Sequence, residues 1–271
     1  MPLFAFAAIL GARQNKGEKA VARIAIRTAA GKAGEEALFA GPADPIHLSV
    51  LTLAPGESGM IGATGEGAAH VWHGGVEAGS VALPAGSSVI LEAGAQQAIR
   101  AGKQGAQLLL FRAAKPPATR AGTARAHLLP AGQVPRHVPE PGAVGAAGGL
   151  HANGECPGCT VWLHENTMAP VSGDAEALRA MAERGVHSHS EDEIIVVTDG
   201  AMRLGARLFG PGTAIAIARD TFYSFTPGPG GLAIVNYRPA APHAFRMKSG
   251  ATADEAGYWR ERVRPPRYVE A

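Results

Sequence analysis

The residues best suited to chemistry gather in the run GVHSHSEDEIIVVTDG, which contains His187, His189 and Glu193. Alternate side chains of a β-strand face the same way, so the two histidines project onto one face, and Glu193 falls on that face too. Two imidazoles and one carboxylate suit a divalent first-row metal such as Fe, Mn, Ni, Co or Zn, and they leave coordination positions open for water or substrate. The spacing therefore predicts a metal site, with Ile195 and Val197 as its apolar lining.

The elements that must position this site are predicted to be short strands. The chain has 271 residues with 36 glycines and 20 prolines, so turns are frequent and long helices are not expected. Short apolar runs separated by turn residues, such as IHLSVLTLA, AQLLLFR and LAIVNYR, are typical of a β-sandwich or barrel. The apolar opening MPLFAFAAILGA has no cationic leader and is interpreted as a starting strand. The Ala-, Pro- and Gly-rich stretch after the first group of runs is predicted to link two domains.

The sequence also repeats itself. Sliding the chain by 126 residues aligns 59–112 with 185–238 without a gap, and eight positions are identical. Six of the eight are glycines, which shared turns would preserve because a positive φ favours Gly. The identical pairs are Gly59/Gly185, Val71/Val197, Gly74/Gly200, Gly79/Gly205, Gly86/Gly212, Gly102/Gly228, Gly105/Gly231 and Arg112/Arg238. We therefore expect two copies of one β-fold.

The first copy lacks the candidate ligands. The positions equivalent to His187, His189, Glu193 and Tyr223 hold Ile61, Ala63, Gly67 and Gln97. The amino-terminal copy is therefore expected to be metal-free and to serve as a packing partner. His70 and His73, three residues apart, would face opposite sides of a strand and are expected at the surface or in a turn.

The second copy holds an insertion beside the metal motif. TLAP at 52–55 matches TMAP at 167–170 only with a shift of 115, which leaves 11 extra residues in SGDAEALRAMAERG. Ser172 or Asp174 would cap a short helix there, and Gly185 would follow its end. The helix would form a wall or lid of the pocket, or simply a packing element.

These motifs resemble those of the cupins. The first cupin motif is a Gly, a His-x-His pair, three or four residues, a Glu, six residues and a Gly. The run from His187 to Gly200 is similar to it, although Gly185 lies closer to the first His than the family glycine does. The second motif is a Gly, five residues, Pro-x-Gly, two residues and a His that is the fourth ligand. GTAIAIARDTFY resembles it only in part, because Ala218 and Asp220 replace Pro and Gly, and Tyr223 stands where the family has His.

The resemblance implies an all-β chain of two tandem double-stranded β-helix (jelly-roll) barrels. The expected parts are a degenerate amino-terminal cupin at 1–115, a linker at 116–149, a metal-binding cupin at 150–247 and an extension at 248–271. Tyr223 would ligate the metal as a phenolate, act beside it as a general acid or base, or merely fill space. Two histidines and one glutamate without a fourth protein ligand also resemble the facial triad of non-haem iron oxygenases.

Further residues are candidates for lining the pocket. Trp162 and His164 share one strand face before the insertion, and Arg203, Phe225 and Asn236 lie on predicted strands that flank the site. These five are the predicted substrate-binding residues. The pair Cys156 and Cys159 is compatible with half a zinc site or a redox pair, although two reduced cysteines in a turn are the simpler interpretation.

Net charge and cysteine content limit the classes of partner that are expected for this protein. The formal charge is +2 and the basic residues are scattered, so no nucleic-acid partner is expected. Two cysteines provide no disulfide framework, which favours a cytoplasmic protein without a membrane partner. A homodimer and a monomer both remain open.

The leading functional hypothesis is a metal-dependent bicupin enzyme, namely a non-haem Fe(II) dioxygenase acting on a small aromatic or keto-type substrate. It would bind one divalent ion per chain, Fe(II) being favoured over Mn, Ni or Zn. The first alternative is a lyase, isomerase or cyclase that uses the metal as a Lewis acid and Tyr223 as acid or base on an acidic small molecule. The second is a non-catalytic cupin that binds a small molecule.

Overall fold

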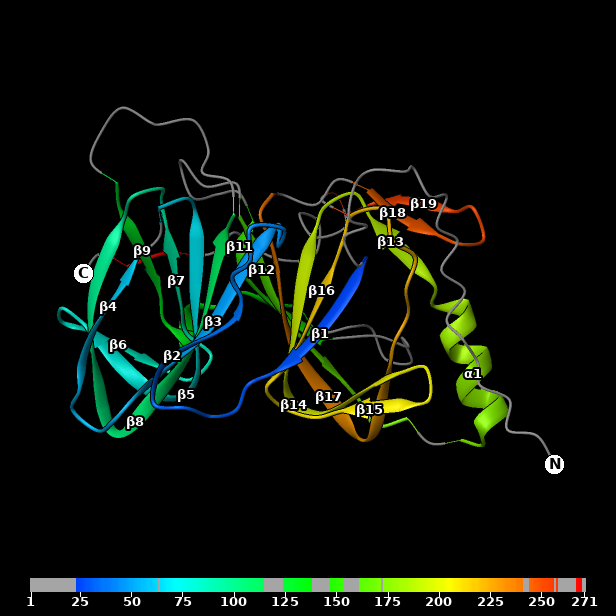
Figure 1. Cartoon of the computed structure of the whole chain (residues 1–271), viewed down its shortest axis with the longest axis horizontal. Coiled ribbons are helices and arrows are strands. Elements are labelled where there is room, and N and C mark those ends of the chain that lie inside the picture. The colour runs from blue at the N-terminus through cyan, green and yellow to red at the C-terminus, as the bar shows by residue number, and fades with distance from the viewer. Residues whose placement is uncertain are drawn as a thin grey trace.

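The computed structural model describes residues 23–62, 64–114, 124–137, 147–153, 161–171, 173–240, 244–255, 257 and 267–269. These residues form two β-bodies that lie side by side (Figure 1). The prediction of an all-β chain built from two tandem barrels is confirmed. The predicted starting strand in MPLFAFAAILGA and the pair Cys156 and Cys159 lie outside the described residues.

The amino-terminal body is an antiparallel sheet with the strand order β2-β3-β8-β5-β7-β9, in which β4 also pairs with β8 and β6 with β5. One set of its apolar side chains encloses the core of this body, and β3, β7 and much of β5 are buried on both faces. The strands are β2 (Gly34–Phe39), β3 (Ile46–Leu53), β4 (Ser58–Gly62), β5 (Gly67–Ala78), β6 (Val81–Pro84), β7 (Ser88–Leu91), β8 (Gln96–Ala113) and β9 (Ala126–Leu129).

The carboxy-terminal body has the order β1-β16-β14-β17-β12-β11-β10, with β15 paired to β14, and a separate sheet β13-β18-β19. Its strands are β1 (Ile24–Thr28), β10 (Arg136–His137), β11 (Ala147–Asn153), β12 (Trp162–Met168), β13 (His187–His189), β14 (Glu193–Leu204), β15 (Arg207–Phe209), β16 (Thr213–Ile217), β17 (Thr226–Arg238), β18 (Ala244–Met247) and β19 (Thr252–Asp254). The described helices are α1 (Ala175–Arg184) and a 3-10 turn at Ala131–Gln133.

The two bodies are copies of one fold, in the register that the sequence predicts. Strands β5 and β14 begin and end 126 residues apart. Gly74 and its equivalent Gly200 have φ of 69° and 67°. A Cβ would lie 2.1 Å from the carbonyl oxygen of Gly105 in the first copy, and 2.3 Å from that of Gly231 in the second. Both turns therefore require glycine for the same two reasons.

Equivalent positions meet at the contact between the bodies. The rings of Phe111 and Tyr237 stack with centroids 5.0 Å apart. The indole Nε1 of Trp72 donates to the carbonyl of Thr198 at 3.0 Å. The members of each pair are 126 residues apart, which is what a twofold axis between the copies produces. A shared core of buried residues from both bodies surrounds this axis.

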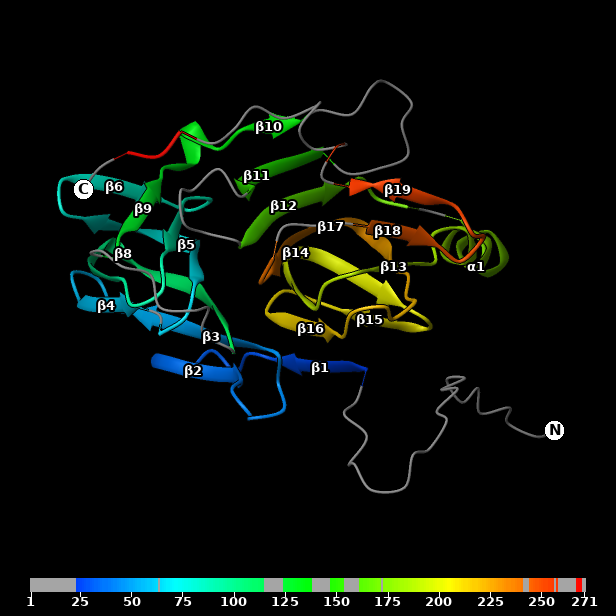
Figure 2. The ribbon, with the colours of Figure 1, turned by 90° about the horizontal axis from the view of Figure 1, so that it is seen from above.

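The bodies also exchange strands. Strand β1 pairs with β16 of the carboxy-terminal body, and β9 pairs with β7 of the amino-terminal body. Figure 2 shows β1 leaving β2 to lie against β16. The partners correspond, because Ile24 faces Ile217 while Ala126 faces Leu91, the equivalent of Ile217. Each exchanged strand covers a sheet edge that would otherwise be open.

This exchange differs from the predicted division of the chain. Residues 24–28 join the carboxy-terminal sheet, although the sequence assigned them to the first domain. The predicted linker contains β9, β10 and part of β11. Composition missed these strands because a short edge strand is identified by its partner rather than by its own residues.

The predicted helix in the insertion is confirmed as α1. Its N-cap is Asp174, whose Oδ1 accepts from the backbone N–H of Ala177 at 2.8 Å, and Gly185 follows its end. None of its residues is buried, so it lies on the surface next to β13. No helix among the described residues is long and apolar enough to cross a membrane.

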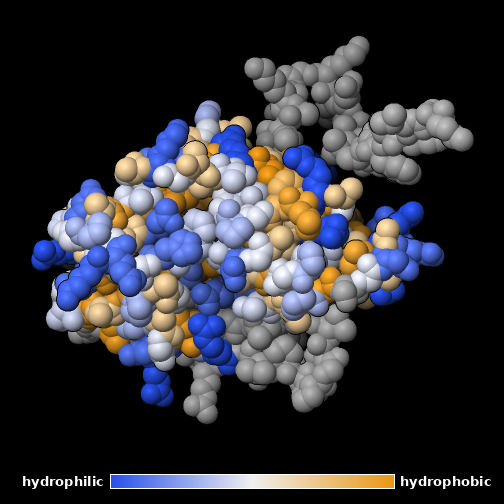
Figure 3. All heavy atoms as spheres, turned by 90° about the horizontal axis from the view of Figure 1, so that it is seen from below, coloured by the Kyte–Doolittle hydropathy of each residue, from blue (hydrophilic) through white to orange (hydrophobic). Residues whose placement is uncertain are grey.

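Exposed apolar side chains on the described surface are scattered. The large ones are Ile26, Met60, Leu208 and Phe222, which come from separate parts of the two bodies. On the face seen in Figure 3, hydrophilic residues lie between the hydrophobic ones. Isolated apolar residues of this kind are ordinary on protein surfaces.

Candidate metal centre

Strand β13 brings the two histidines of the motif together. His187 and His189 have ring centroids 5.0 Å apart. Tyr223 lies directly opposite His187, because each residue's backbone N–H donates to the other's carbonyl, at 3.0 and 2.9 Å. Its ring centroid is 4.6 Å from that of His187. The same bridge joins Ile61 and Gln97 in the first copy, so the sequence alignment holds at the site itself.

Glu193 begins β14 and lies at the bottom of the site, fully buried. Its Oε2 accepts from the side-chain amide of Asn236 at 2.6 Å. The hydroxyl of Tyr223 also lies near this carboxylate and helps to lower the pKa of Glu193. The structure thus brings together His187, Glu193, Tyr223 and Asn236, four of the predicted site residues.

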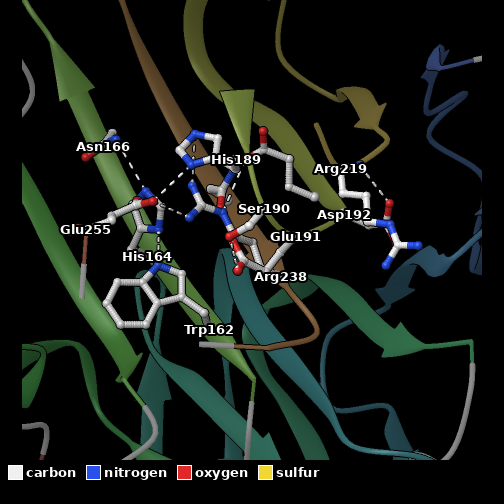
Figure 4. Close-up of polar contacts among 12 residues, drawn as sticks. Trp162, His164, Asn166, His189, Ser190, Glu191, Asp192, Arg219, Arg238 and Glu255 are labelled. Atoms are coloured by element: carbon white, nitrogen blue, oxygen red, sulfur yellow. Dashed lines mark hydrogen bonds and ion pairs between the residues drawn. The ribbon is translucent and has the colours of Figure 1, made fainter. Parts of the chain in front are cut away.

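A buried guanidinium, that of Arg238, lies beside these residues. Its Nε donates to Oε2 of Glu193 at 3.3 Å and its Nη1 to Oε2 of Glu255 at 2.8 Å. Its Nη2 lies 3.3 Å from Nε2 of His189. Glu255, which follows β19, also accepts from Nδ1 of His189 at 2.9 Å. Figure 4 shows Arg238, His189 and Glu255 pointing toward one another.

The hydrogen-bond partners assign the protons of both histidines. Nδ1 of His189 faces a carboxylate and Nδ1 of His187 lies 2.7 Å from the carbonyl of Gly185, and both partners only accept. Each Nδ1 therefore carries a hydrogen. Nε2 of His189 faces a guanidinium, which only donates, so it carries a lone pair. Burial lowers the pKa of His187, so its Nε2 also carries a lone pair at neutral pH.

The electrostatics keep the carboxylates charged and the phenol neutral. Burial alone would raise the pKa of Glu193, but the charge of Arg238 and the hydrogen bonds from Tyr223 and Asn236 lower it overall. For Glu255, burial is likewise outweighed by the hydrogen bond from His189 and the charge of Arg238, which lower its pKa. Burial and the charge of Glu193 raise the pKa of Tyr223 well above 10. The site thus holds two anions, one fixed cation and a protonated phenol.

His164 lies next to this cluster on β12, as a predicted pocket residue. Its Nδ1 accepts from the indole N–H of Trp162 at 2.8 Å. Burial, and then the charge of Arg238, lower the pKa of His164 to about 3. A neutral imidazole whose Nδ1 accepts must carry its hydrogen on Nε2. His164 is therefore a fixed hydrogen-bond donor, and in this tautomer it has no lone pair to offer a metal at Nε2.

The other two predicted pocket residues differ in how near they lie to the site. Phe225 stacks on Tyr223 with centroids 6.2 Å apart and faces the apolar interior of the barrel. Arg203 lies near the opposite end of β14 from Glu193 and pairs with Thr226. Ten strand residues correspond to about 33 Å. The structure therefore does not bring Arg203 to the site.

The histidines of the first copy are only partly as expected. His73 is exposed, as predicted, but the prediction was wrong for His70, which is buried. Its Nδ1 lies 3.3 Å from Oγ of Ser88, and its Nε2 lies 3.7 Å from Oε1 of Glu165 in the other body. The contact between the two bodies covers the face of β5 that carries His70. The residue pattern of that strand alone does not reveal this burial.

Three residues of the site were missed from the sequence. Arg238 carried a signal, because Arg112/Arg238 is the one charged pair among the eight identities. Glu255 and Phe245 carried none, since they come from the predicted extension and from the strand that pairs with β13. Phe245 stacks on His187 with centroids 4.7 Å apart and so covers the outer side of the histidines.

The types of donor atom in the site suit a divalent metal, but Arg238 contacts some of the same atoms. Both histidines carry Nε2 lone pairs and hold their Nδ1 hydrogens on outer acceptors, as metal-binding histidines do. Glu193 supplies a buried anionic oxygen. Arg238, however, is bonded to both His189 and Glu193. Among the described residues, no three His, Cys, Asp or Glu side chains are arranged to hold a metal ion as they stand.

Comparisons with known proteins identify the fold. No protein-family model and no curated protein matches the sequence. Among solved structures, Escherichia coli Ylba aligns over 83% of this chain and 93% of its own, with 16% identity and a TM-score of 0.56. Oxalate decarboxylase from Lactobacillus farciminis, in its formate complex, aligns over 90% and 92%, with 11% identity and a TM-score of 0.60. A Bacillus subtilis oxalate decarboxylase aligns over 80% and 72%, with 12% identity and a TM-score of 0.52. The chain therefore has the two-domain cupin fold.

Proposed function

We propose that the carboxy-terminal body is the active site of a metal-dependent enzyme that acts on a small carboxylic acid. His187, His189 and Glu193 would hold one divalent ion per chain. The observation that carries the proposal is the pair of Nε2 lone pairs, which are fixed by outer hydrogen bonds beside a buried anionic Glu193. Such an ion would act as a Lewis acid toward a substrate oxygen.

The chain's own residues supply binding and proton transfer. Arg238 is a buried positive charge beside the metal ligands, which favours a negatively charged substrate. Tyr223 is protonated beside Glu193 and would serve as the proton donor once a bound cation lowers its pKa. Oxalate decarboxylases, which share the fold, are named for a small dicarboxylate.

These observations favour the lyase, isomerase or cyclase class over the dioxygenase that the sequence placed first. A protonated phenol beside a carboxylate is suited to proton transfer, and proton transfer needs no oxygen. The dioxygenase retains one supporting observation: two histidines and one glutamate converge without a fourth histidine, as in a facial triad. Dependence on oxygen separates the two classes.

The test is turnover without oxygen. The full chain, loaded in turn with Mn²⁺, Fe²⁺, Ni²⁺ and Zn²⁺, is incubated anaerobically with a panel of dicarboxylates, hydroxy acids and 2-oxo acids. Products are detected by NMR. We expect anaerobic turnover of at least one acid. Turnover that requires oxygen would establish the dioxygenase instead, and metal and ligand binding without turnover would establish a non-catalytic cupin.

Tyr223→Phe tests the proton-transfer role. We expect kcat to fall by about 10²-fold or more while bound metal is retained. The matched control is Gln97→Ala at the equivalent position of the first copy, which should leave kcat unchanged. Loss of metal from Tyr223→Phe would show that Tyr223 is a ligand.

A further inference from the structure

The guanidinium of Arg238 is bonded to the same atoms that a metal would need. Nε2 of His189 has a single lone pair, and Nη2 of Arg238 lies 3.3 Å from it. Oε2 of Glu193 already accepts from Asn236 at 2.6 Å and from Nε of Arg238 at 3.3 Å. A metal and Arg238 cannot both use the lone pair of His189.

Resting on the metal site proposed above, we infer that Arg238 is a resident cation that competes with the metal for His189 and Glu193. In the metal-free protein, Arg238 neutralises part of the buried negative charge and completes the hydrogen bonds of the site. When a metal binds, Arg238 releases Nε2 of His189 and its contact with Glu193. The freed N–H groups are then available to bind the carboxylate of a substrate.

Glu255 keeps the side chains of the site in place when a metal replaces Arg238. One oxygen of Glu255 accepts from both Nη1 of Arg238 and Nδ1 of His189. Neither contact uses an atom that the metal needs. Glu255 is therefore a positioning residue, which keeps Arg238 in the site and keeps the Nε2 lone pair of His189 available in both states.

Charge makes the competition testable. The described cluster contains one buried carboxylate, one partly buried carboxylate and one guanidinium. Replacing Arg238 with a neutral residue would leave both carboxylates uncompensated and would free the lone pair of His189. The site should then be less stable when empty and should bind a divalent cation more tightly.

The experiment measures the affinity of Mn²⁺ for the full chain by equilibrium dialysis, and thermal unfolding with and without Mn²⁺. The variants are Arg238→Met and Arg238→Gln, with Arg112→Met as the matched control in the first copy. We expect both Arg238 variants to bind Mn²⁺ at least about tenfold more tightly than the wild type. We also expect their Tm to fall without metal and to recover with it, whereas Arg112→Met should match the wild type in affinity.

Each outcome decides between the two proposals. If the wild type binds Mn²⁺ and the Arg238 variants bind it with equal or weaker affinity, the competition is overturned and the proposed metal site is retained. Absence of Mn²⁺ binding to every protein overturns both. If a variant folds poorly, it is refolded with and without Mn²⁺: recovery by the metal supports the competition, and failure to recover overturns it.

Discussion

Arg112 and Arg238 occupy equivalent positions near the ends of β8 and β17, yet their surroundings differ. Arg112 is a quarter exposed and contacts Glu35, Ser49 and the carbonyl of Gly62, at 3.0 to 3.1 Å. The side chain of Arg238 is 3% exposed and bonds two glutamates and a histidine. One scaffold thus holds the same arginine in a surface network in one body and in a buried polar site in the other.

The difference separates the features that both bodies share from those that only the site requires. Strand register, turn glycines and the arginine are common to both bodies. The site additionally requires imidazoles and carboxylates that converge, and a segment that covers them. Strand β18 pairs with β13, and β19 pairs with β18, which places Phe245 and Glu255 at the site. In the first copy, β4, the equivalent of β13, pairs only with β8 among the described strands.

The largest expected effect separates the partly buried Glu255 from the exposed Glu35. Glu255→Gln removes a charge that holds both Arg238 and His189, and breaking a buried pair costs about 3–5 kcal/mol. Glu35→Gln breaks the exposed pair with Arg112, which costs at most about 1 kcal/mol. Urea unfolding of both variants measures the difference. Equal costs would show that the two arginine networks are energetically alike.

A smaller effect is expected where the two bodies meet. Phe111→Tyr would bury a second hydroxyl beside Tyr237, at a cost of about 1–3 kcal/mol. Tyr237→Phe removes a hydroxyl that has no hydrogen-bond partner among the described residues, so unfolding free energy should stay the same or rise by up to about 1 kcal/mol. Denaturant unfolding checks both changes. A loss of stability in Tyr237→Phe would reveal a partner for that hydroxyl.

The smallest effect is a pH dependence in the first body. Burial raises the pKa of Glu35, but hydrogen bonds from Ser49 and Arg112 and the charge of Arg112 lower it overall. A lowered folded-state pKa stabilises the protein above the unfolded pKa of about 4.3, and this contribution disappears as pH falls through the folded value. The stability difference between wild type and Glu35→Gln should therefore be constant above about pH 5 and shrink below pH 4. A difference that grows at low pH would contradict the assignment.

Local patterns predicted much of the fold and part of the site. The turn glycines and the alternation of His187 and His189 depend only on nearby residues, so they were visible in the sequence. The exchange of β1 and β9 was not, because it depends on which sheet edge each strand meets. Glu255 reaches His189 from 66 residues away, and no spacing rule connects them. Arg203 was misplaced for a different reason, because it lies near the opposite end of β14 from Glu193.

The central claim is that one of the two cupin bodies holds a metal ion. Equilibrium dialysis of the full chain against saturating Mn²⁺ tests it most directly, with His189→Ala and Gln97→Ala as the matched pair. We predict one ion per chain in the wild type and in Gln97→Ala, and none in His189→Ala. Two ions per chain, none in the wild type, or full retention in His189→Ala would contradict this account.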